Sequence, residues 1–371
     1  MRIVYTHNVF GYQAYGGISR YLVEVIKRIP AEEAQVQVFA GLHINQYLGG
    51  LPGVIGIRVP VLNHAGFGQR IINRLIQLIR MRVNNLIERA FLRTDDQTIL
   101  HLSYYTRRHF KKGVKIVVTV YDMIHELFPQ YYPPWDRTTH RKRLCCERAD
   151  RLIAISHCTK KDLVNLLGID EKKVTVIYLG NSLENTMPED CVKIVDRPYL
   201  LYVGERGGYK NFNHLIKAFS HSPPLRNDFA LVCFGGRNFT PHERKRLSSL
   251  GIDHLVHYVS GSDSLFAGYY KNARALVFPS LYEGFGLPPL EAMGLGCPVI
   301  CSNKGPIPEI VGEAGIYFDP EDVNNMQYIL EKALYDDTLL EEMVKRGYQR
   351  SSTFSWDRTA SQTIALYRSL L

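Results

Sequence analysis

The chain has 371 residues, of which 46% are hydrophobic and 22% charged, which excludes a disordered or fibrous protein and favours two folded domains. Residues 1–180 contain 26 Lys and Arg against 14 Asp and Glu, a net charge of +12, whereas residues 181–371 contain 19 against 22, a net charge of −3. The positive half favours an anionic ligand or surface, although an uneven solvated surface accounts for the charge equally well.

The predicted elements alternate between apolar strands and helical patterns. The chain opens on an apolar run without the basic start or cleavage site of a signal peptide, so we expect it to be the first strand. Two series of runs predict strands, at 2–6, 35–40, 98–102, 115–120, 151–155 and 174–178, and then at 199–203, 229–234, 255–259, 274–278, 298–301 and 315–318. Such runs between helices indicate two parallel sheets, and therefore two doubly wound α/β domains.

The boundary between the two series is a polar stretch, NSLENTMPEDCVKIVDR, which has few strand-forming residues and ends before Pro198. We predict an N-terminal domain over residues 1–180, a linker over 181–197 and a C-terminal domain over 198–355.

Residues 68–93 combine an apolar pattern of helical period with six arginines and a single acidic residue, Glu88. The arginines are Arg70, Arg74, Arg80, Arg82, Arg89 and Arg93, and a second basic cluster follows at 107–115. A helix packed on its own domain gives the same apolar pattern. The basic polar face favours contact with an anionic membrane surface instead. No stretch approaches the ~18 uncharged apolar residues that a spanning helix needs.

Three glycine-rich loops follow predicted strands. Gly16 and Gly17 stand between the first strand and the first helix, where they form either a tight turn or a phosphate contact. VGERGGYKN places Arg206 and Lys210 directly after a strand, and cations there can hold a diphosphate.

The third loop, YEGFGLPPLEAMGLGCPVI, carries Glu283 and Glu291 on either side of a predicted helix start. Pro288 and Pro289 suit a first helical turn, and the helix N-terminus attracts phosphate. Since the glutamates repel phosphate, we expect them to accept hydrogen bonds from the hydroxyls of a nucleotide sugar. A role in stabilising the helix dipole explains Glu291 but not the glycines around Glu283.

This loop resembles the E-x7-E signature of retaining glycosyltransferases of family four, which have the GT-B fold. GGISRY, VGERGGYKN, LIAISHCTKKDL and VTVYDMIHELFP add to the resemblance, which runs from residue 1 to about 355. It implies two Rossmann-like domains facing a central cleft, with the donor held mainly by the second and the acceptor by the first. It also implies that residues 356–371 form a helix crossing back to the N-terminal domain.

The resemblance assigns roles residue by residue. Glu283 resembles the glutamate near the donor sugar, Glu291 the ribose-binding glutamate, and Arg206 with Lys210 the cations that stabilise the departing diphosphate. Further donor-binding candidates are Gly16, Gly17, Val259, Gly284, Phe285, Gly286 and Leu287. Many relatives carry a histidine before the aspartate of V-T-V-x-D, whereas this chain has Tyr121 there, followed by Asp122 and His125. Any of these three is a candidate contact to the transferred sugar.

The implied reaction is retaining transfer of a hexose from a nucleotide diphosphate sugar to a saccharide or lipid-linked acceptor in cell-surface polysaccharide biosynthesis. We favour glucose from UDP-glucose or a close UDP-hexose, with GDP-mannose as the alternative. No Asp-x-Asp motif is present, so we expect neither a metal nor another cofactor. The seven cysteines show no zinc-like spacing, which fits reduced thiols in a cytoplasmic protein that meets the inner membrane face peripherally.

Other classes fit less well. A dinucleotide-binding oxidoreductase needs G-x-G-x-x-G after the first strand, but the chain has GGISR there. A nucleotide-sugar epimerase or hydrolase could have the same architecture and bind the same donor. Only the E-x7-E resemblance favours a glycosyltransferase over these two enzymes. A non-catalytic sensor would not need all four charged site residues, and no RNA- or DNA-binding motif is present.

Overall fold

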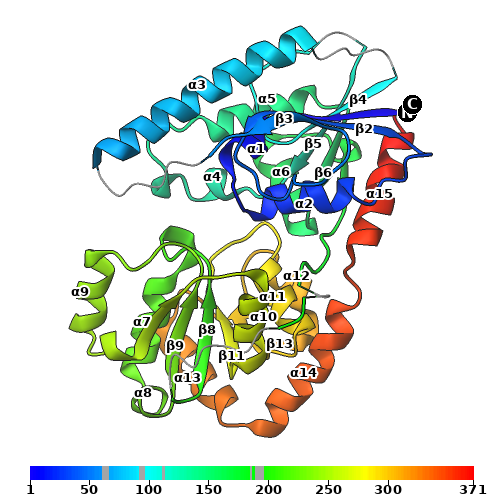
Figure 1. The fold of residues 1–371 in the computed structure, drawn as a ribbon. Coiled ribbons are helices and arrows are strands. Elements are labelled where there is room, and N and C mark those ends of the chain that lie inside the picture. The colour runs from blue at the N-terminus through cyan, green and yellow to red at the C-terminus, as the bar shows by residue number, and fades with distance from the viewer. Residues whose placement is uncertain (61–66, 92–96, 111–112, 184–185, 189–195) are drawn as a thin grey trace. The chain divides into compact units, whose positions relative to one another are not determined.

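The computed structural model describes all residues except 61–66, 92–96, 111–112, 184–185 and 189–195. The chain divides into two compact units (Figure 1). The first contains residues 1–126, 132–179 and 356–371, and the second contains 127–131 and 180–355. Most of the stretch expected to be the linker lies outside the described residues.

The first unit is built on a parallel sheet of seven strands, β1 (Arg2–Tyr5), β2 (Gln35–His43), β3 (Val54–Arg58), β4 (Thr98–Leu102), β5 (Lys115–Val120), β6 (Arg151–Ala154) and β7 (Val174–Val176). The order is β3-β2-β1-β4-β5-β6-β7, so the winding reverses between β1 and β4. Its helices are α1 (Asn8–Tyr12), α2 (Gly17–Ile26), α3 (Phe67–Phe91), α4 (Ile124–Leu127), α5 (Thr138–Arg148), α6 (His157–Leu167) and α15 (Trp356–Arg368).

The second unit contains a six-stranded parallel sheet in the order β10-β9-β8-β11-β12-β13. Its strands are β8 (Tyr199–Val203), β9 (Ala230–Phe234), β10 (Val256–Val259), β11 (Ala275–Phe278), β12 (Val299–Ser302) and β13 (Gly315–Phe318). The helices are α7 (Phe212–His221), α8 (Pro223–Asp228), α9 (Pro241–Ser249), α10 (Asp263–Asn272), α11 (Leu287–Gly294), α12 (Ile307–Val311), α13 (Val323–Leu334) and α14 (Asp337–Ser351). Buried apolar side chains of these strands and helices form its core.

The expectation of two doubly wound parallel-sheet units is confirmed, and every predicted strand has an observed counterpart. The sequence analysis missed β3, which lies at the edge of the first sheet and exposes most of its residues. An edge strand lacks the continuous apolar run of a buried parallel strand, and β3 also contains Gly56.

The C-terminal helix α15 packs within the first unit. The Tyr367 hydroxyl lies 2.9 Å from that of Tyr5 on β1, and it also contacts Nδ1 of His101 on β4. The Thr359 hydroxyl donates to the carbonyl of Tyr178 at 2.7 Å. Because these contacts join distant parts of the chain, and Tyr5, His101 and Tyr367 are fully buried, α15 contributes to the core of this unit.

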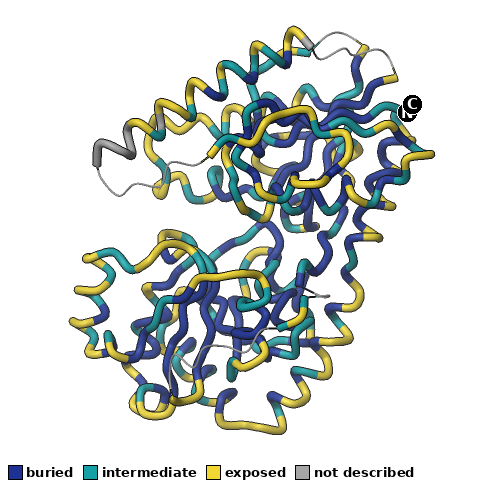
Figure 2. The backbone as a smooth tube through the Cα atoms, in the orientation of Figure 1, coloured by how far each residue is buried: buried dark blue, intermediate teal, exposed yellow. Residues whose placement is uncertain are grey.

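Much of helix α3 is exposed (Figure 2). Its buried side chains include the polar residues Arg80, Asn84 and Glu88, whereas several of its large apolar side chains are exposed. Leu75, Leu78, Ile79 and Leu86 expose 54–64% of their surface, so the expected apolar stripe is not core. Arg80 is buried and donates to the carbonyl of Gly11 at 2.6 Å, so it is not part of the basic solvent face. The side chains of Arg70, Arg74, Arg93, Lys111 and Lys112 lie outside the described residues. Among the helices described, none is both long and apolar enough to cross a membrane.

Candidate functional site

The loop from β11 into α11 carries both glutamates of the predicted donor site. Gly286 precedes the helix with φ of 117°, a left-handed conformation that glycine adopts without strain. Pro288 and Pro289 lie in the first turn, where a missing amide hydrogen costs no helical hydrogen bond. The predicted helix start is therefore confirmed, and because the two prolines have no amide hydrogen, Leu287 is the one residue of the first three that can offer an amide to an anion.

Lys210 and Glu283 form an ion pair at this helix start. Lys210 ends the short helix η3 (Gly208–Lys210), and its Nζ lies 2.8 and 3.0 Å from the two carboxylate oxygens of Glu283. The Leu281 amide donates to the carbonyl of Tyr209 at 2.8 Å, which joins the two loops. These loops follow β8 and β11, where the strand order reverses, and open α/β sheets bind ligands at such points.

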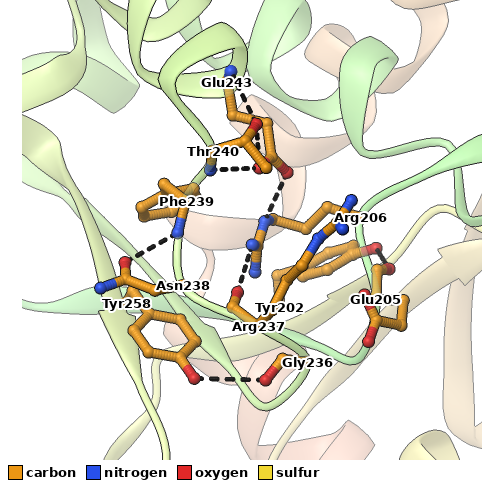
Figure 3. Close-up of polar contacts among 10 residues, drawn as sticks. All are labelled: Tyr202, Glu205, Arg206, Gly236, Arg237, Asn238, Phe239, Thr240, Glu243 and Tyr258. Carbon is orange, nitrogen blue, oxygen red and sulfur yellow. Dashed lines mark hydrogen bonds and ion pairs between the residues drawn. The ribbon is translucent and has the colours of Figure 1, made fainter. Parts of the chain in front are cut away.

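Arg206 belongs to the same loop as Lys210 but contacts a different helix (Figure 3). Its Nε lies 2.9 Å from a carboxylate oxygen of Glu243, it donates to the carbonyl of Arg237, and its guanidinium lies 4.5 Å from the ring centre of Phe239. Burial raises the pKa of Glu243, but hydrogen bonds from Thr240 and the Arg206 guanidinium outweigh this and lower the pKa below its ordinary value. Glu243 and Thr240 also cap α9.

Arg206 and Lys210, which we expected to hold one diphosphate together, contact different carboxylates in the structure. Among the described residues Arg206 is paired with Glu243 and Lys210 with Glu283. Arg206 retains one buried nitrogen, Nη1, without a hydrogen-bond partner in the described part of the chain, and it lines a cavity of about 220 Å³.

Glu291 is buried one turn into α11, and the Tyr270 hydroxyl of α10 donates to its Oε2 at 3.3 Å. Burial, together with the Glu291 carboxylate, raises the pKa of Tyr270, which therefore remains a donor at neutral pH. Phe285 packs inside, edge-on to Phe354, so its ring belongs to the core. The carbonyl of Val259, at the end of β10, accepts from the Gly235 amide at 2.9 Å.

The predicted phosphate loop at Gly16 and Gly17 starts α2 in the first unit. The side-chain oxygen of Gln13 accepts from the Ser19 amide at 3.1 Å, so one amide of this helix start already has a partner. A Cβ on Gly16 would lie 2.5 Å from the same Gln13 oxygen. A side chain at this position would displace the Gln13 amide group, so the glycine has a local packing role whether or not a phosphate binds.

The three candidates after β5 differ in exposure. Tyr121 is buried, with its hydroxyl 3.4 Å from the carbonyl of Ser103, whereas Asp122 and His125 are half-buried. His125 stacks on Tyr132 with ring centres 3.8 Å apart. Burial lowers the pKa of His125, so its imidazole is neutral at pH 7. Asp122 and His125 are thus better placed than Tyr121 to contact a ligand.

A buried lysine, Lys142 on α5, was not predicted. Its Nζ donates to the carbonyl of Asp122 at 2.7 Å and to Glu126 Oε2 at 2.7 Å. Lys142 therefore holds the loop that carries Asp122 and His125. The surrounding sequence, THRKRLCCER, reads as an exposed basic helix and does not distinguish this lysine from its neighbours.

Two family models match the chain. The model described as "Glycosyltransferase Family 4" matches residues 15–185, and "Glycosyl transferases group 1" matches residues 184–350.

Curated relatives and a solved structure also match. O-antigen chain mannosyltransferase B of Escherichia coli is 26% identical over 389 residues that cover 100% of both chains. Serotype-specific mannosyltransferase WbdA of Escherichia coli is 29% identical over 69% of this chain, which spans only 34% of that protein. A sucrose-phosphate synthase of Thermosynechococcus elongatus has the same fold, with a TM-score of 0.74, 20% identity and coverage of 100% of this chain and 98% of that one.

Proposed function

Because the chain belongs to glycosyltransferase family four and has the GT-B fold, we propose that it transfers mannose from GDP-mannose to a growing saccharide of a cell-surface polysaccharide. Both curated relatives described above are named mannosyltransferases, which supports mannose over the glucose favoured by the sequence. The donor site rests on one observation, the Lys210–Glu283 pair at the start of α11 with Glu291 one turn further on.

In the proposed reaction, the bond between the anomeric carbon and the diphosphate oxygen breaks, and the acceptor hydroxyl oxygen attacks from the same face. The electron pair of the broken bond goes to the diphosphate, one of whose oxygens takes the acceptor proton. Lys210 and the Leu287 amide at the start of α11 stabilise the growing negative charge. Glu283 exchanges its bond to Lys210 for sugar hydroxyls, and Glu291 accepts hydrogen bonds from the ribose.

A donor screen tests this function. The native protein is incubated with GDP-mannose, UDP-glucose and other GDP- and UDP-hexoses, with and without an acceptor glycan extract, and nucleotide release is followed. We expect acceptor-dependent release of GDP from GDP-mannose. Faster release of UDP from UDP-glucose would replace mannose by glucose, and release from none of the donors would overturn the proposed transferase activity.

The reaction should need no divalent metal. The sequence lacks an Asp-x-Asp motif, and we propose that Lys210 and the Leu287 amide neutralise the leaving diphosphate. Nucleotide release should therefore continue at the native rate in excess EDTA. Loss of activity in EDTA that returns with Mg²⁺ or Mn²⁺ would contradict this assignment.

We also propose that the first unit binds an anionic membrane surface through α3. Four large apolar side chains of this helix, Leu75, Leu78, Ile79 and Leu86, expose more than half of their surface, and exposed patches of this kind commonly mark interaction sites. The net charge of +12 on residues 1–180 complements anionic lipid, where each basic residue contributes about 1 kcal/mol.

Liposome co-sedimentation tests the membrane contact. Native protein should bind anionic vesicles, less so in high salt, and should bind neutral vesicles weakly. The variant Leu75→Gln/Ile79→Gln/Leu86→Gln should lose most of this binding. The control Leu166→Gln/Met187→Gln, which changes exposed apolar residues outside α3, should not. Equal binding of the triple variant and the native protein would eliminate α3 as the contact.

A further inference from the structure

A pocket of about 350 Å³ in the first unit is lined by five arginines and by no acidic residue among those described. Arg82 and Arg89 come from the exposed side of α3, Arg107 and Arg108 from the loop after β4, and Arg141 from α5. No other pocket described in this unit gathers positive charge in this way. None of these five arginines is among the residues predicted to bind the donor.

Most of this positive charge has no carboxylate partner among the described residues. Arg108 lies 2.7 Å from Glu88, whose other contact is His7 at 2.9 Å. Arg141 interacts with Asp136 electrostatically, but no ion pair within 4.0 Å joins it, Arg82, Arg89 or Arg107 to any acidic residue that the structure describes. Guanidinium groups gathered around a pocket repel one another, and a bound anion relieves that repulsion.

The pocket also lies where a doubly wound sheet binds ligands. It is lined by Asn8, which follows β1, and by Tyr105 and Thr106, which follow β4. The strand order of the first sheet reverses between β1 and β4, and ligands of such sheets bind beyond the carboxyl ends of the strands at that point. The amide of Asn85 adds a neutral donor.

The chemistry of this lining fits phosphate. Arginine presents two parallel N–H groups that match phosphate oxygens, and several arginines together suit a diphosphate better than a single carboxylate. One side of the pocket is apolar, because Leu78 and Met81 of α3 line it. Leu78 continues into the exposed apolar face of α3 formed by Leu75, Ile79 and Leu86. A ligand with a diphosphate and a hydrocarbon chain would satisfy both surfaces.

We propose that the pocket formed by Arg82, Arg89, Arg107, Arg108 and Arg141 binds the diphosphate of a lipid-linked acceptor, with its hydrocarbon chain along α3. This inference rests on the proposed function, which requires an acceptor, and it specifies the acceptor's anionic linkage. The acceptor saccharide then extends from the carboxyl ends of β1 and β4. Asp122 and His125 follow β5, and β5 is the neighbour of β4 in the sheet.

Calorimetry with geranyl diphosphate tests the pocket directly. The titration uses native protein in saturating GDP and, separately, UDP, so that the donor site is occupied. Arg82→Gln/Arg89→Gln should weaken the binding at least tenfold. Lys161→Gln/Lys172→Gln, which removes two exposed charges elsewhere in the same unit, should bind as the native protein does. Circular dichroism melts confirm that both variants are folded.

Further titrations distinguish a lipid diphosphate from free pyrophosphate, and they test the arginine pocket separately from the proposed sugar transfer. Geraniol should not bind, and inorganic pyrophosphate should bind more weakly than geranyl diphosphate. Pyrophosphate binding of equal strength would overturn the lipid-linked ligand, and native-like binding by the arginine variant would overturn the pocket. If native protein binds geranyl diphosphate through these arginines but turns over no nucleotide sugar, the proposed function fails while the pocket stands.

Discussion

Replacing Lys210 by alanine should lower the rate of sugar transfer by about 100-fold, because its ammonium faces charge that grows on the leaving diphosphate. The loss should be in kcat more than in KM, since a group that binds the transition state more strongly than the ground state affects kcat. Initial rates of nucleotide release over a range of donor concentrations measure both. The structure supports this choice, because Lys210 already meets an anion, Glu283, at the start of α11.

The matched control is Lys332→Ala. Lys332 is an exposed lysine of α13 in the same unit, with no ion pair within the described residues, so its loss should leave the rate unchanged. If the Lys210→Ala protein melts at the native temperature and retains the native kcat, Lys210 does not stabilise the leaving diphosphate.

Replacing Glu291 by alanine should weaken nucleoside diphosphate binding by about 1–3 kcal/mol, or roughly 5- to 150-fold, because the ribose hydroxyls lose their acceptor. Calorimetry with GDP and UDP gives the affinity. Tyr270→Phe is the control, since it removes the hydroxyl that donates to Glu291 and keeps the carboxylate. This control should bind nucleotide nearly as the native protein does, and a folded Glu291→Ala protein with native affinity would refute the ribose assignment.

The sequence predicted the two sheets and the start of α11 because these features depend on local patterns. Buried parallel strands read as continuous apolar runs, and Gly286 with Pro288 and Pro289 signals a helix start. The edge strand β3 lacks that pattern and was missed. Periodicity also identified α3 as a helix, but it did not reveal that the apolar face is exposed.

Side-chain partners were harder to predict, because they depend on segments far apart in the sequence. Arg206 was grouped with Lys210 because they share a loop, yet Arg206 pairs with Glu243, 37 positions away. The arginine pocket joins three segments, α3, the loop after β4 and α5, that only the folded sheet brings together. Arg80 belongs to the same helical run as Arg82, but one is buried and the other exposed.

The most direct test of the central claim is hydrogen–deuterium exchange of the native protein with and without nucleotide. The claim is that the loop ending at Lys210 and the start of α11 bind the donor. Saturating GDP or UDP should slow exchange in peptides covering residues 204–210 and 282–294, because amides that bind phosphate or lie beneath it are protected. If neither nucleotide slows exchange in those two segments, the donor nucleotide does not bind there and the account is wrong.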